Sequence, residues 1–302
     1  GAAATSHGLA TLGFGSLASG GLGMAGGTVV VTAVGSALGG TLGGVATSAY
    51  VSADDSFAIE RLEDGIGTPV IFITGFLTEK DTEWADWGAL IRSRYPEAPI
   101  YRLRWGAKEL AALTTLLGGG VAKESVRQLL VKKALTATAE AVGKIGPLAA
   151  MFAAADLASN QWSVAHARAG MTGAALADLI KRTHQDYVLI GHSLGARVAV
   201  TAAQALGTNP DEKPRIESMH LLGAAVDDSG DWQSLNNAVS DTIWNYWSRN
   251  DKVLALAYKA ARLGGVAVGQ AGFNSGFARI KDREVSKKVP SHSAYVTNVN
   301  LR

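Results

Sequence analysis

Short apolar runs alternate with longer stretches of helical pattern over most of this chain. The runs are rich in β-branched and aromatic residues and end at glycine, proline or charged residues, which predicts strands. They lie at residues 68–73, 99–105, 187–190, 216–222 and 242–247. Segments with apolar positions at helical spacing lie between them, among them residues 81–95 and 174–183. This alternation predicts an α/β protein with a mostly parallel sheet and flanking helices.

The first 53 residues follow a different pattern. They contain no Asp, Glu, Lys or Arg, and 14 of the 36 glycines lie within the first 50 positions. Gly35, Gly39 and Gly43 recur every four residues, which on a helix forms a flat stripe for close helix packing. We therefore predict a Gly/Ala-rich helical segment over residues 1–53. Membrane contact through residues 8–51 and close packing on the rest of the protein are its two alternatives, because glycine is costly in a helix and large apolar residues are sparse.

Composition excludes several classes of function. The formal net charge is +2 and no block is rich in lysine or arginine, so nothing indicates nucleic-acid binding. Cysteine is absent and the six histidines lack metal-ligand spacing, so we expect no disulfide, no metal and no cofactor. No basic region precedes an apolar run, as in an ordinary secretory signal peptide, so we expect a cytoplasmic or membrane-associated protein. The start at Gly1 indicates a processed chain or a fragment.

The best-defined chemical motif is Gly-His-Ser-Leu-Gly at residues 191–195, between a predicted strand and a helical pattern at residues 196–203. It is the only Gly-x-Ser-x-Gly in the chain. A strand, a sharp turn and a helix with serine at the apex form a nucleophile elbow, which holds the serine hydroxyl exposed; the two glycines allow close packing. We predict Ser193 as the nucleophile, with an incidental serine in a glycine-rich turn as the alternative.

A serine nucleophile needs a histidine as base, and in α/β-hydrolases the chain order is Ser, Asp/Glu, His. Two histidines follow the elbow. His220 lies within a predicted strand, where its side chain would point into a packed layer. His292 lies in a loop after the last predicted strand, so we predict His292 as the base.

The acid must lie between the nucleophile and the base. Asp251 follows the end of the predicted strand at residues 242–247. Asp227 and Asp228 follow the preceding strand, where some hydrolases have their acid. Loop position and chain order favour Asp251, with Asp227 and Asp228 as alternatives.

Two backbone N–H groups should stabilise the oxyanion of such a site. One belongs to Leu194, the residue after the nucleophile, and the other comes from the loop after the first predicted strand. Gly75 in that loop permits a close backbone approach, so we predict the N–H of Phe76, with Leu77 as the second choice. A plain β–α turn with a buried phenylalanine is the alternative.

Several blocks of sequence carry a family resemblance between about Tyr50 and the end of the chain. They lie at residues 70–81, 104–105, 160–169, 191–198, 245–254 and 292–295. These blocks resemble the α/β-hydrolase family of unknown function typified by the transmembrane and coiled-coil domain-containing proteins. The resemblance implies a lipase-like or esterase-like α/β-hydrolase fold and supports Ser193, Asp251 and His292. It departs at Ala225, which stands where the family often has a proline.

A long stretch rich in alanine and leucine separates the second and third predicted strands, from Gly106 to about Trp162. In a hydrolase such a helical insertion commonly caps the active site, which favours an apolar substrate; extra packing is the alternative. We predict a hydrolase domain over residues 54–302 with a helical cap insertion over about residues 106–165.

These features predict a serine hydrolase that cleaves carboxylic acyl esters, lipids or phospholipids among them, through an acyl-enzyme intermediate. The alternative is a hydrolase-fold scaffold or membrane adaptor in which the elbow persists without much catalysis. A triad serves esters, phospholipids, thioesters and amides alike, so the residues do not choose among these substrates.

Overall fold

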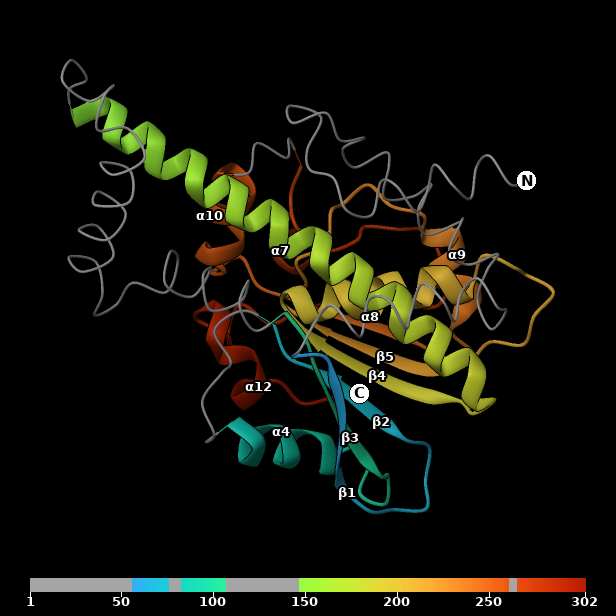
Figure 1. The fold of residues 1–302 in the computed structure, drawn as a ribbon. Helices are drawn as coiled ribbons and strands as arrows, with labels where there is room; N and C mark the ends of the chain where they lie inside the picture. Colours follow the sequence, from blue (N-terminus) through green and yellow to red (C-terminus); the bar gives the residue numbers. More distant parts are fainter. Residues whose placement is uncertain (1–55, 76–82, 107–146, 261–264) are drawn as a thin grey trace, which may run out of the picture.

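A seven-stranded sheet lies between two groups of helices (Figure 1). The computed structural model describes residues 56–75, 83–106, 147–260 and 265–302. The strands are β1 (Ala58–Glu63), β2 (Val70–Ile73), β3 (Ile100–Arg104), β4 (Tyr187–His192), β5 (Ile216–Leu222), β6 (Ile243–Trp247) and β7 (Ile280–Glu284). Their order in the sheet is β1-β3-β2-β4-β5-β6-β7. Only the pairing of β1 with β3 is antiparallel among these strands, which confirms the predicted mostly parallel sheet.

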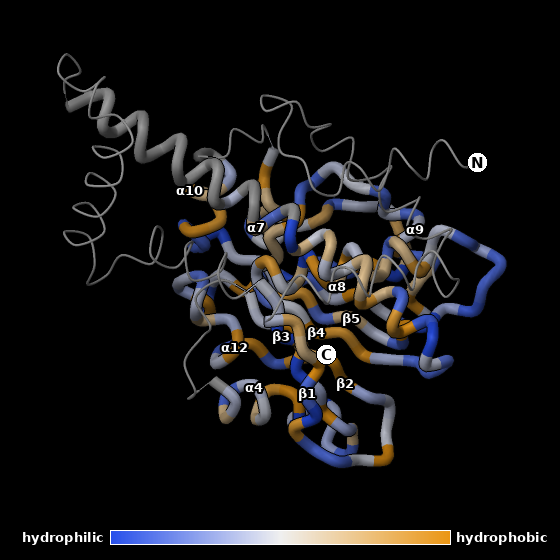
Figure 2. The backbone as a smooth tube through the Cα atoms, viewed as in Figure 1, coloured by the Kyte–Doolittle hydropathy of each residue, from blue (hydrophilic) through white to orange (hydrophobic). Residues whose placement is uncertain are grey.

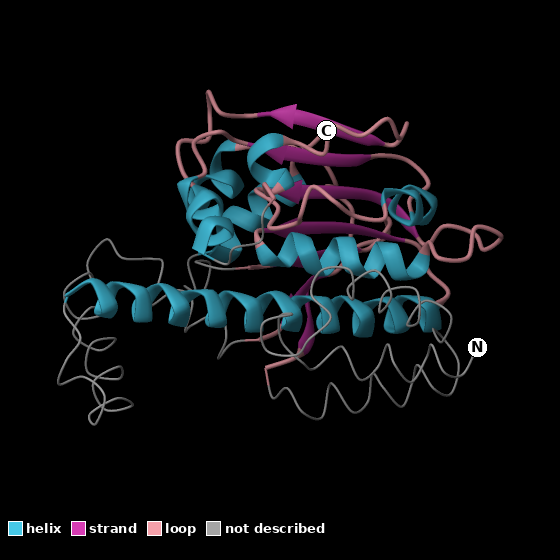
Figure 3. Cartoon of the chain, turned by 90° about the horizontal axis from the view of Figure 1, so that it is seen from above, coloured by secondary structure: helices cyan, strands magenta, loops and turns pink. Residues whose placement is uncertain are grey.

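Helices cover both faces of this sheet. They are α4 (Glu83–Arg92), α7 (Pro147–Thr183), α8 (Leu194–Leu206), α9 (Trp232–Ala238), α10 (Lys252–Ala260), α11 (Val268–Ala271) and α12 (Tyr295–Asn298), with a short 3-10 helix η3 (His292–Ala294). Viewed from above, α8 lies against the sheet and α7 runs alongside α8 farther out (Figure 3). The helices α4 and α12 pack together on the opposite face.

The central strands are buried on both faces, because residues of a strand point alternately to opposite sides. In β2, Ile71 and Ile73 pack on the side of α7 and α8. Val70 and Phe72 pack on the side of α4, where Trp87 stacks on Phe72 with ring centroids 4.8 Å apart. The loop between α8 and β5 lies outside this packed core and is hydrophilic, as Figure 2 shows at the right of the view.

Three elements differ from the sequence-based expectation. The edge strands β1 and β7 were not predicted, because charged residues interrupt their apolar pattern. An edge strand tolerates such charges, since one of its sides is not paired. The helix expected at residues 174–183 begins much earlier, at Pro147. The single helix α7 therefore also includes the last part of the predicted cap insertion.

Several predictions lie outside the described residues. They concern residues 1–53, the loop with Phe76 and Leu77, and the predicted cap up to residue 146. Within the described ranges no helix is both long enough and apolar enough to cross a membrane. The division into residues 1–53 and 54–302 therefore stays a prediction.

Candidate active site

The elbow at the carboxyl end of β4 holds Ser193 in a strained backbone conformation. Its φ is 59° and its ψ is −124°, which is uncommon for a residue with a side chain. The turn is tight on both sides: a Cβ at Gly191 would lie 2.6 Å from the backbone nitrogen of Ala196, and one at Gly195 would collide with the carbonyl oxygen of Ile73. Glycine is therefore needed at both positions.

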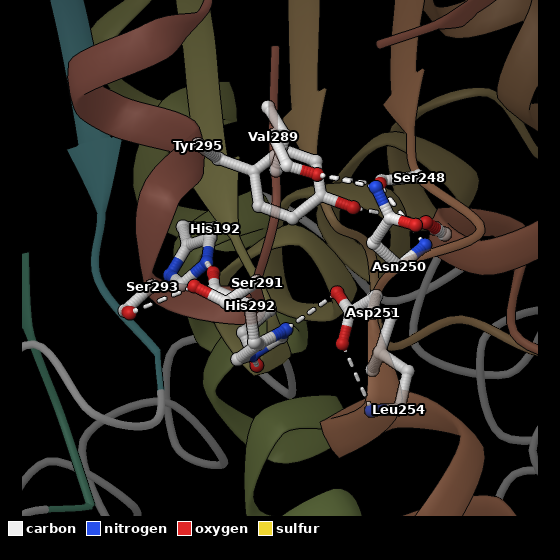
Figure 4. A network of polar contacts seen from close by, with 12 residues as sticks. His192, Ser248, Asn250, Asp251, Leu254, Val289, Ser291, His292, Ser293 and Tyr295 are labelled. Carbon is white, nitrogen blue, oxygen red and sulfur yellow. Dashed lines mark hydrogen bonds and ion pairs between the residues drawn. The ribbon is translucent and has the colours of Figure 1, made fainter. Parts of the chain in front are cut away.

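Three predicted residues lie together at this elbow. His292 Nε2 lies 2.8 Å from Ser193 Oγ, and His292 Nδ1 lies 2.7 Å from Asp251 Oδ2. The other carboxylate oxygen of Asp251 accepts a hydrogen bond of 3.0 Å from the N–H of Leu254 in the first turn of α10. Figure 4 shows His292 pointing toward Asp251. This chain of contacts has the geometry of a serine, histidine and carboxylate triad.

The loops that carry Asp251 and His292 are bound to each other. Ser248 Oγ donates to the carbonyl oxygen of Val289 at 2.9 Å (Figure 4). The side-chain amide of Asn250 donates to the carbonyl oxygen of Ser286 at 2.8 Å. These bonds join the loop after β6 to the loop before His292. Sequence reasoning missed Ser248 and Asn250 as positioning residues, although both lie in the block that carries the family resemblance.

His192 fixes the backbone of His292. Its Nε2 lies 2.9 Å from the carbonyl oxygen of His292, which can only accept, so Nε2 carries the proton and donates. Burial, with the nearby His292 as a further cause, lowers the pKa of His192 to about 3. His192 is therefore neutral at physiological pH. Sequence reasoning did not single out this residue, because its partner is a main-chain atom a hundred positions away.

The side chains of the candidate site are enclosed. Ser193, Asp251 and His292 have relative exposures of 0%, 0% and 1%. The expectation of an exposed serine is therefore wrong: the His292 ring occupies part of the space beside the hydroxyl. The same low-dielectric surroundings strengthen electrostatic interactions within the site.

The predicted oxyanion-binding groups are described only in part. Leu194 is the first residue of α8, and first-turn N–H groups have no partner within their own helix. Gly75 lies against the elbow, since a Cβ there would be 2.8 Å from the nitrogen of Leu194 and 2.9 Å from Cβ of Ser193. Phe76 and Leu77 lie outside the described residues. Their role stays a prediction.

The remaining candidate residues lie elsewhere. His220 is fully buried in β5, on the α4 side of the sheet, where its Nε2 contacts Tyr95 Oη at 2.7 Å. Asp227 lies near His166 of α7 rather than near His292. Asp228 is exposed. Within the described residues no group of histidine and carboxylate side chains has the arrangement of a metal site.

A mostly parallel sheet with a nucleophile elbow at the end of a central strand defines the α/β-hydrolase fold, and this protein has that fold. The chain matches the family described as "Protein of unknown function (DUF726)" over residues 1–301 and belongs to it.

Two relatives of this chain carry names of membrane proteins. The "Transmembrane and coiled-coil domain-containing protein STS1" of Oryza sativa subsp. japonica is 27% identical over 236 residues, which cover 75% of this chain and 34% of that protein. The "Uncharacterized membrane protein F35D11.3" of Caenorhabditis elegans is 28% identical over 264 residues, or 80% of this chain and 42% of that protein. The chain thus spans less than half the length of these relatives.

Two solved structures are similar over most of the chain. A protein of unknown function, ATU1826, from Agrobacterium tumefaciens is 13% identical with a TM-score of 0.36, covering 79% of this chain and 83% of that chain. The carboxylesterase CesB (YbfK) from Bacillus subtilis is 9% identical with a TM-score of 0.32, covering 84% of this chain and 92% of that one. The fold assignment above rests on the sheet and the elbow of this chain.

Proposed function

We propose that this protein is a serine hydrolase that cleaves carboxylic acyl esters, with lipids or phospholipids as substrates. The observation that carries the proposal is the continuous hydrogen-bond chain from Ser193 Oγ through the His292 ring to Asp251. A structural role for these residues would not require a strained backbone at Ser193. The acyl-ester class also agrees with the family resemblance described above.

The mechanism follows from the roles of the three groups. His292 Nε2 takes the proton of Ser193 Oγ as the oxygen attacks the ester carbonyl carbon, and the Leu194 N–H, with that of Phe76, stabilises the negative oxygen. The C–O bond then breaks, and the leaving alcohol oxygen takes the proton from His292. Water attacks the acyl-enzyme in the same way, so that a carboxylic acid leaves and Ser193 regains its proton.

Asp251 acts through the base. Its carboxylate accepts the Nδ1–H of His292, which fixes the ring orientation and leaves Nε2 unprotonated and facing the serine. The charge of Asp251 also stabilises the imidazolium that forms during both acyl-transfer steps.

A fluorophosphonate probe and p-nitrophenyl esters of increasing chain length test this function. The probe should label Ser193, and Ser193→Ala should abolish labelling and lower ester turnover by at least ~10³-fold, because the covalent route is lost. The substitution removes one oxygen and should change the free energy of unfolding by no more than about 1–2 kcal/mol.

Ser291→Ala is a suitable control, because Ser291 is an exposed serine beside the base. The Ser291→Ala variant should still be labelled at Ser193, with an unchanged stoichiometry. If the wild-type protein is not labelled, or if Ser193→Ala retains turnover near the wild-type rate, the hydrolase proposal fails. The alternative of a scaffold with little activity would then stand.

We further propose that residues 8–51 bring the protein to a membrane. Both relatives have names that describe membrane proteins, and this segment carries no charged side chain. Such a location suits a hydrolase of lipid esters, because its substrates lie in the bilayer.

A further inference from the structure

A second group of polar side chains lies next to the candidate triad. Trp162 and His166 come from α7, Arg197 from α8, Asp227 from the chain after β5, and Tyr258 from α10. We call these five residues the polar cluster. Apart from Arg197, which is partly buried, their relative exposures lie between 1% and 9%. Four separate segments thus bring polar groups into one buried place.

Asp227 connects the members of the polar cluster. Its Oδ2 lies 3.7 Å from His166 Nε2 and 3.7 Å from Arg197 Nη1. Both distances are longer than a direct hydrogen bond, so neither contact satisfies the hydrogen-bonding capacity of these side chains. The ring of Trp162 lies 6.2 Å from that of His166 and 5.9 Å from that of Tyr258, centroid to centroid.

Four polar atoms of the polar cluster are buried without a hydrogen-bond partner in the part of the chain that the structure describes. They are Trp162 Nε1, His166 Nε2, Asp227 Oδ1 and Tyr258 Oη. More than nine in ten buried polar groups in folded proteins have a partner, so four exceptions in one cluster require either a binding partner or a structural role.

The polar cluster adjoins the nucleophile from two directions. Arg197 follows Ser193 by four residues on α8, a rise of about 6 Å, and helical side chains lean toward the helix amino terminus. The N–H of Ala225 donates to the carbonyl oxygen of Ser193 at 3.1 Å, and Asp227 lies two residues farther along. Two segments of the polar cluster are thus continuous with the residues that form the elbow.

Charge selects among the molecules that could bind there. The Arg197 guanidinium and the Asp227 carboxylate cancel, and burial lowers the pKa of His166 well below its usual value, with the Arg197 charge as a further cause. A bound anion would face Asp227, and a bound cation would face Arg197. An acyl chain would leave the four polar atoms buried and unpaired.

We propose that the polar cluster binds a neutral polyhydroxylated group, of the glycerol type, as the leaving group of the ester. Hydroxyls both donate and accept, so they match Asp227 Oδ1 as an acceptor and Trp162 Nε1–H as a donor, with Tyr258 in either role. The aromatic rings pack against the carbon skeleton between the hydroxyls. This inference rests on the ester hydrolysis proposed above and names its substrate class.

Two esters with the same acyl chain test the proposal. Glycerol monobutyrate and propyl butyrate have leaving groups with the same three-carbon skeleton and differ by two hydroxyls. We expect the wild-type kcat/KM to be at least about 10-fold higher for the glycerol ester, because the propyl ester leaves buried polar groups unpaired. A ratio near one would overturn the proposal.

Tyr258→Phe assigns the preference to the polar cluster. This substitution removes a hydroxyl that lies near Asp227 but makes no hydrogen bond of ordinary length in the described residues, and the ratio of kcat/KM should fall by about 5-fold or more. The matched control is Tyr187→Phe, at the opposite end of β4 from Ser193, and its ratio should equal that of the wild type. Equal ratios in wild type and Tyr258→Phe would also overturn the proposal.

Thermal melting of the free protein separates a ligand site from buried structural water. Tyr258→Phe should keep the midpoint of the free protein at or above the wild-type value, since an unpaired buried hydroxyl is removed. A clear fall in the midpoint would mean that the hydroxyl serves the folded structure, and the proposal would be wrong.

Failure of the hydrolase proposal remains distinguishable from failure of this one. If the wild-type protein hydrolyses neither ester, calorimetry with the folded Ser193→Ala variant measures binding of the same two molecules without turnover. Tighter binding of glycerol monobutyrate than of propyl butyrate would support the polar cluster as a polyol site. Equal binding would overturn it.

Discussion

At the scale of single residues, the buried aspartates Asp251 and Asp227 have different surroundings. Asp251 has both oxygens engaged, one by His292 and one by the N–H of Leu254, so its orientation is fixed. Asp227 has one oxygen without a partner in the described residues and the other 3.7 Å from two cationic or polar groups. Of the two, only Asp251 is therefore placed to orient the His292 ring.

Asp251→Asn should lower kcat/KM by about 10²–10⁴-fold, because the His292 ring loses the acceptor that fixes its tautomer and the support for its cation. The exposed Asp228 provides the matched control, and Asp228→Asn should stay within a few-fold of the wild type. Both variants are assayed with p-nitrophenyl butyrate after their melting temperatures are shown to be similar. Comparable losses in the two variants would contradict the assignment of Asp251.

Residue-scale prediction from the sequence depended on chain order. The order of Ser193, Asp251 and His292 along the chain is a strong guide, because the fold imposes it. The polar cluster could not be predicted, since His166 precedes the elbow strand and lies in a helix of unremarkable composition. Its meeting with Asp227 is set by tertiary packing, which leaves no local pattern.

At the scale of helices and strands, glycine positions set how closely α8 can approach the sheet. Gly195, in the first turn of α8, lies against the carbonyl group of Ile73 at the end of β2. Gly170 of α7, in contrast, has no atom within 4 Å of where a Cβ would lie. The same residue type thus has a packing role at Gly195 and none at Gly170.

Gly195→Ala should lower the free energy of unfolding by about 1–3 kcal/mol, because the added methyl group forces α8 away from β2. Gly170→Ala should be neutral or raise it by up to about 1 kcal/mol, since alanine favours a helix. Urea unfolding followed by circular dichroism measures both. A Gly195→Ala protein as stable as the wild type would show that the close contact of α8 with β2 is unimportant.

Element prediction succeeded where burial produces a clear pattern. The apolar runs of β2, β4 and β5 lie in the middle of the sheet and were predicted as strands. In α7 the prediction was incomplete, because it placed a helix only at residues 174–183. The helix also includes the residues before 174, because the side of α7 that packs on α8 accepts small residues: a Cβ at Gly173 would collide with α8, 2.6 Å from the carbonyl oxygen of Val198.

At the scale of the whole molecule, buried histidines make the stability of the folded state depend on pH. Burial lowers the pKa of both His192 and His220 to about 3, with His292 and Arg94 respectively as further causes. In the unfolded chain each would titrate near 6.5. Below pH 6.5 the unfolded state therefore binds protons that the folded state does not, and the folded state loses stability as the pH falls toward 3.

Each of these histidines should lower the free energy of unfolding by about 1.4 kcal/mol per pH unit between about pH 6 and pH 3.5. Urea unfolding at pH 7, 6, 5 and 4 measures the total slope, to which carboxylates also contribute. His220→Gln removes one titrating group, so its stability should fall less steeply with pH than that of the wild type. Identical slopes would mean that His220 takes up a proton in the folded state.

Deletion of residues 1–47 tests the proposed membrane contact. Turnover of a short soluble ester should stay within a few-fold of the full chain, because this segment has no titratable side chain except His7. Binding to liposomes and turnover of long-chain lipid esters should fall. If the truncated protein precipitates while the full chain ignores liposomes, the glycines serve packing on the protein body and the membrane proposal should be dropped.

The positive φ of Ser193 determines what happens to the candidate site when the protein partly unfolds. Such a conformation costs about 1–3 kcal/mol and lasts only while the surroundings hold it. Two hydrogen bonds stabilise it here: the Ser193 N–H donates to the carbonyl oxygen of Leu222, and the N–H of Ala225 donates to the carbonyl oxygen of Ser193. Detachment of β5 would break the bond to Leu222, and the serine would then be held less firmly in this conformation. Under the proposed function, damaged or partly folded copies should therefore lose hydrolase activity rather than keep a reactive serine without selectivity.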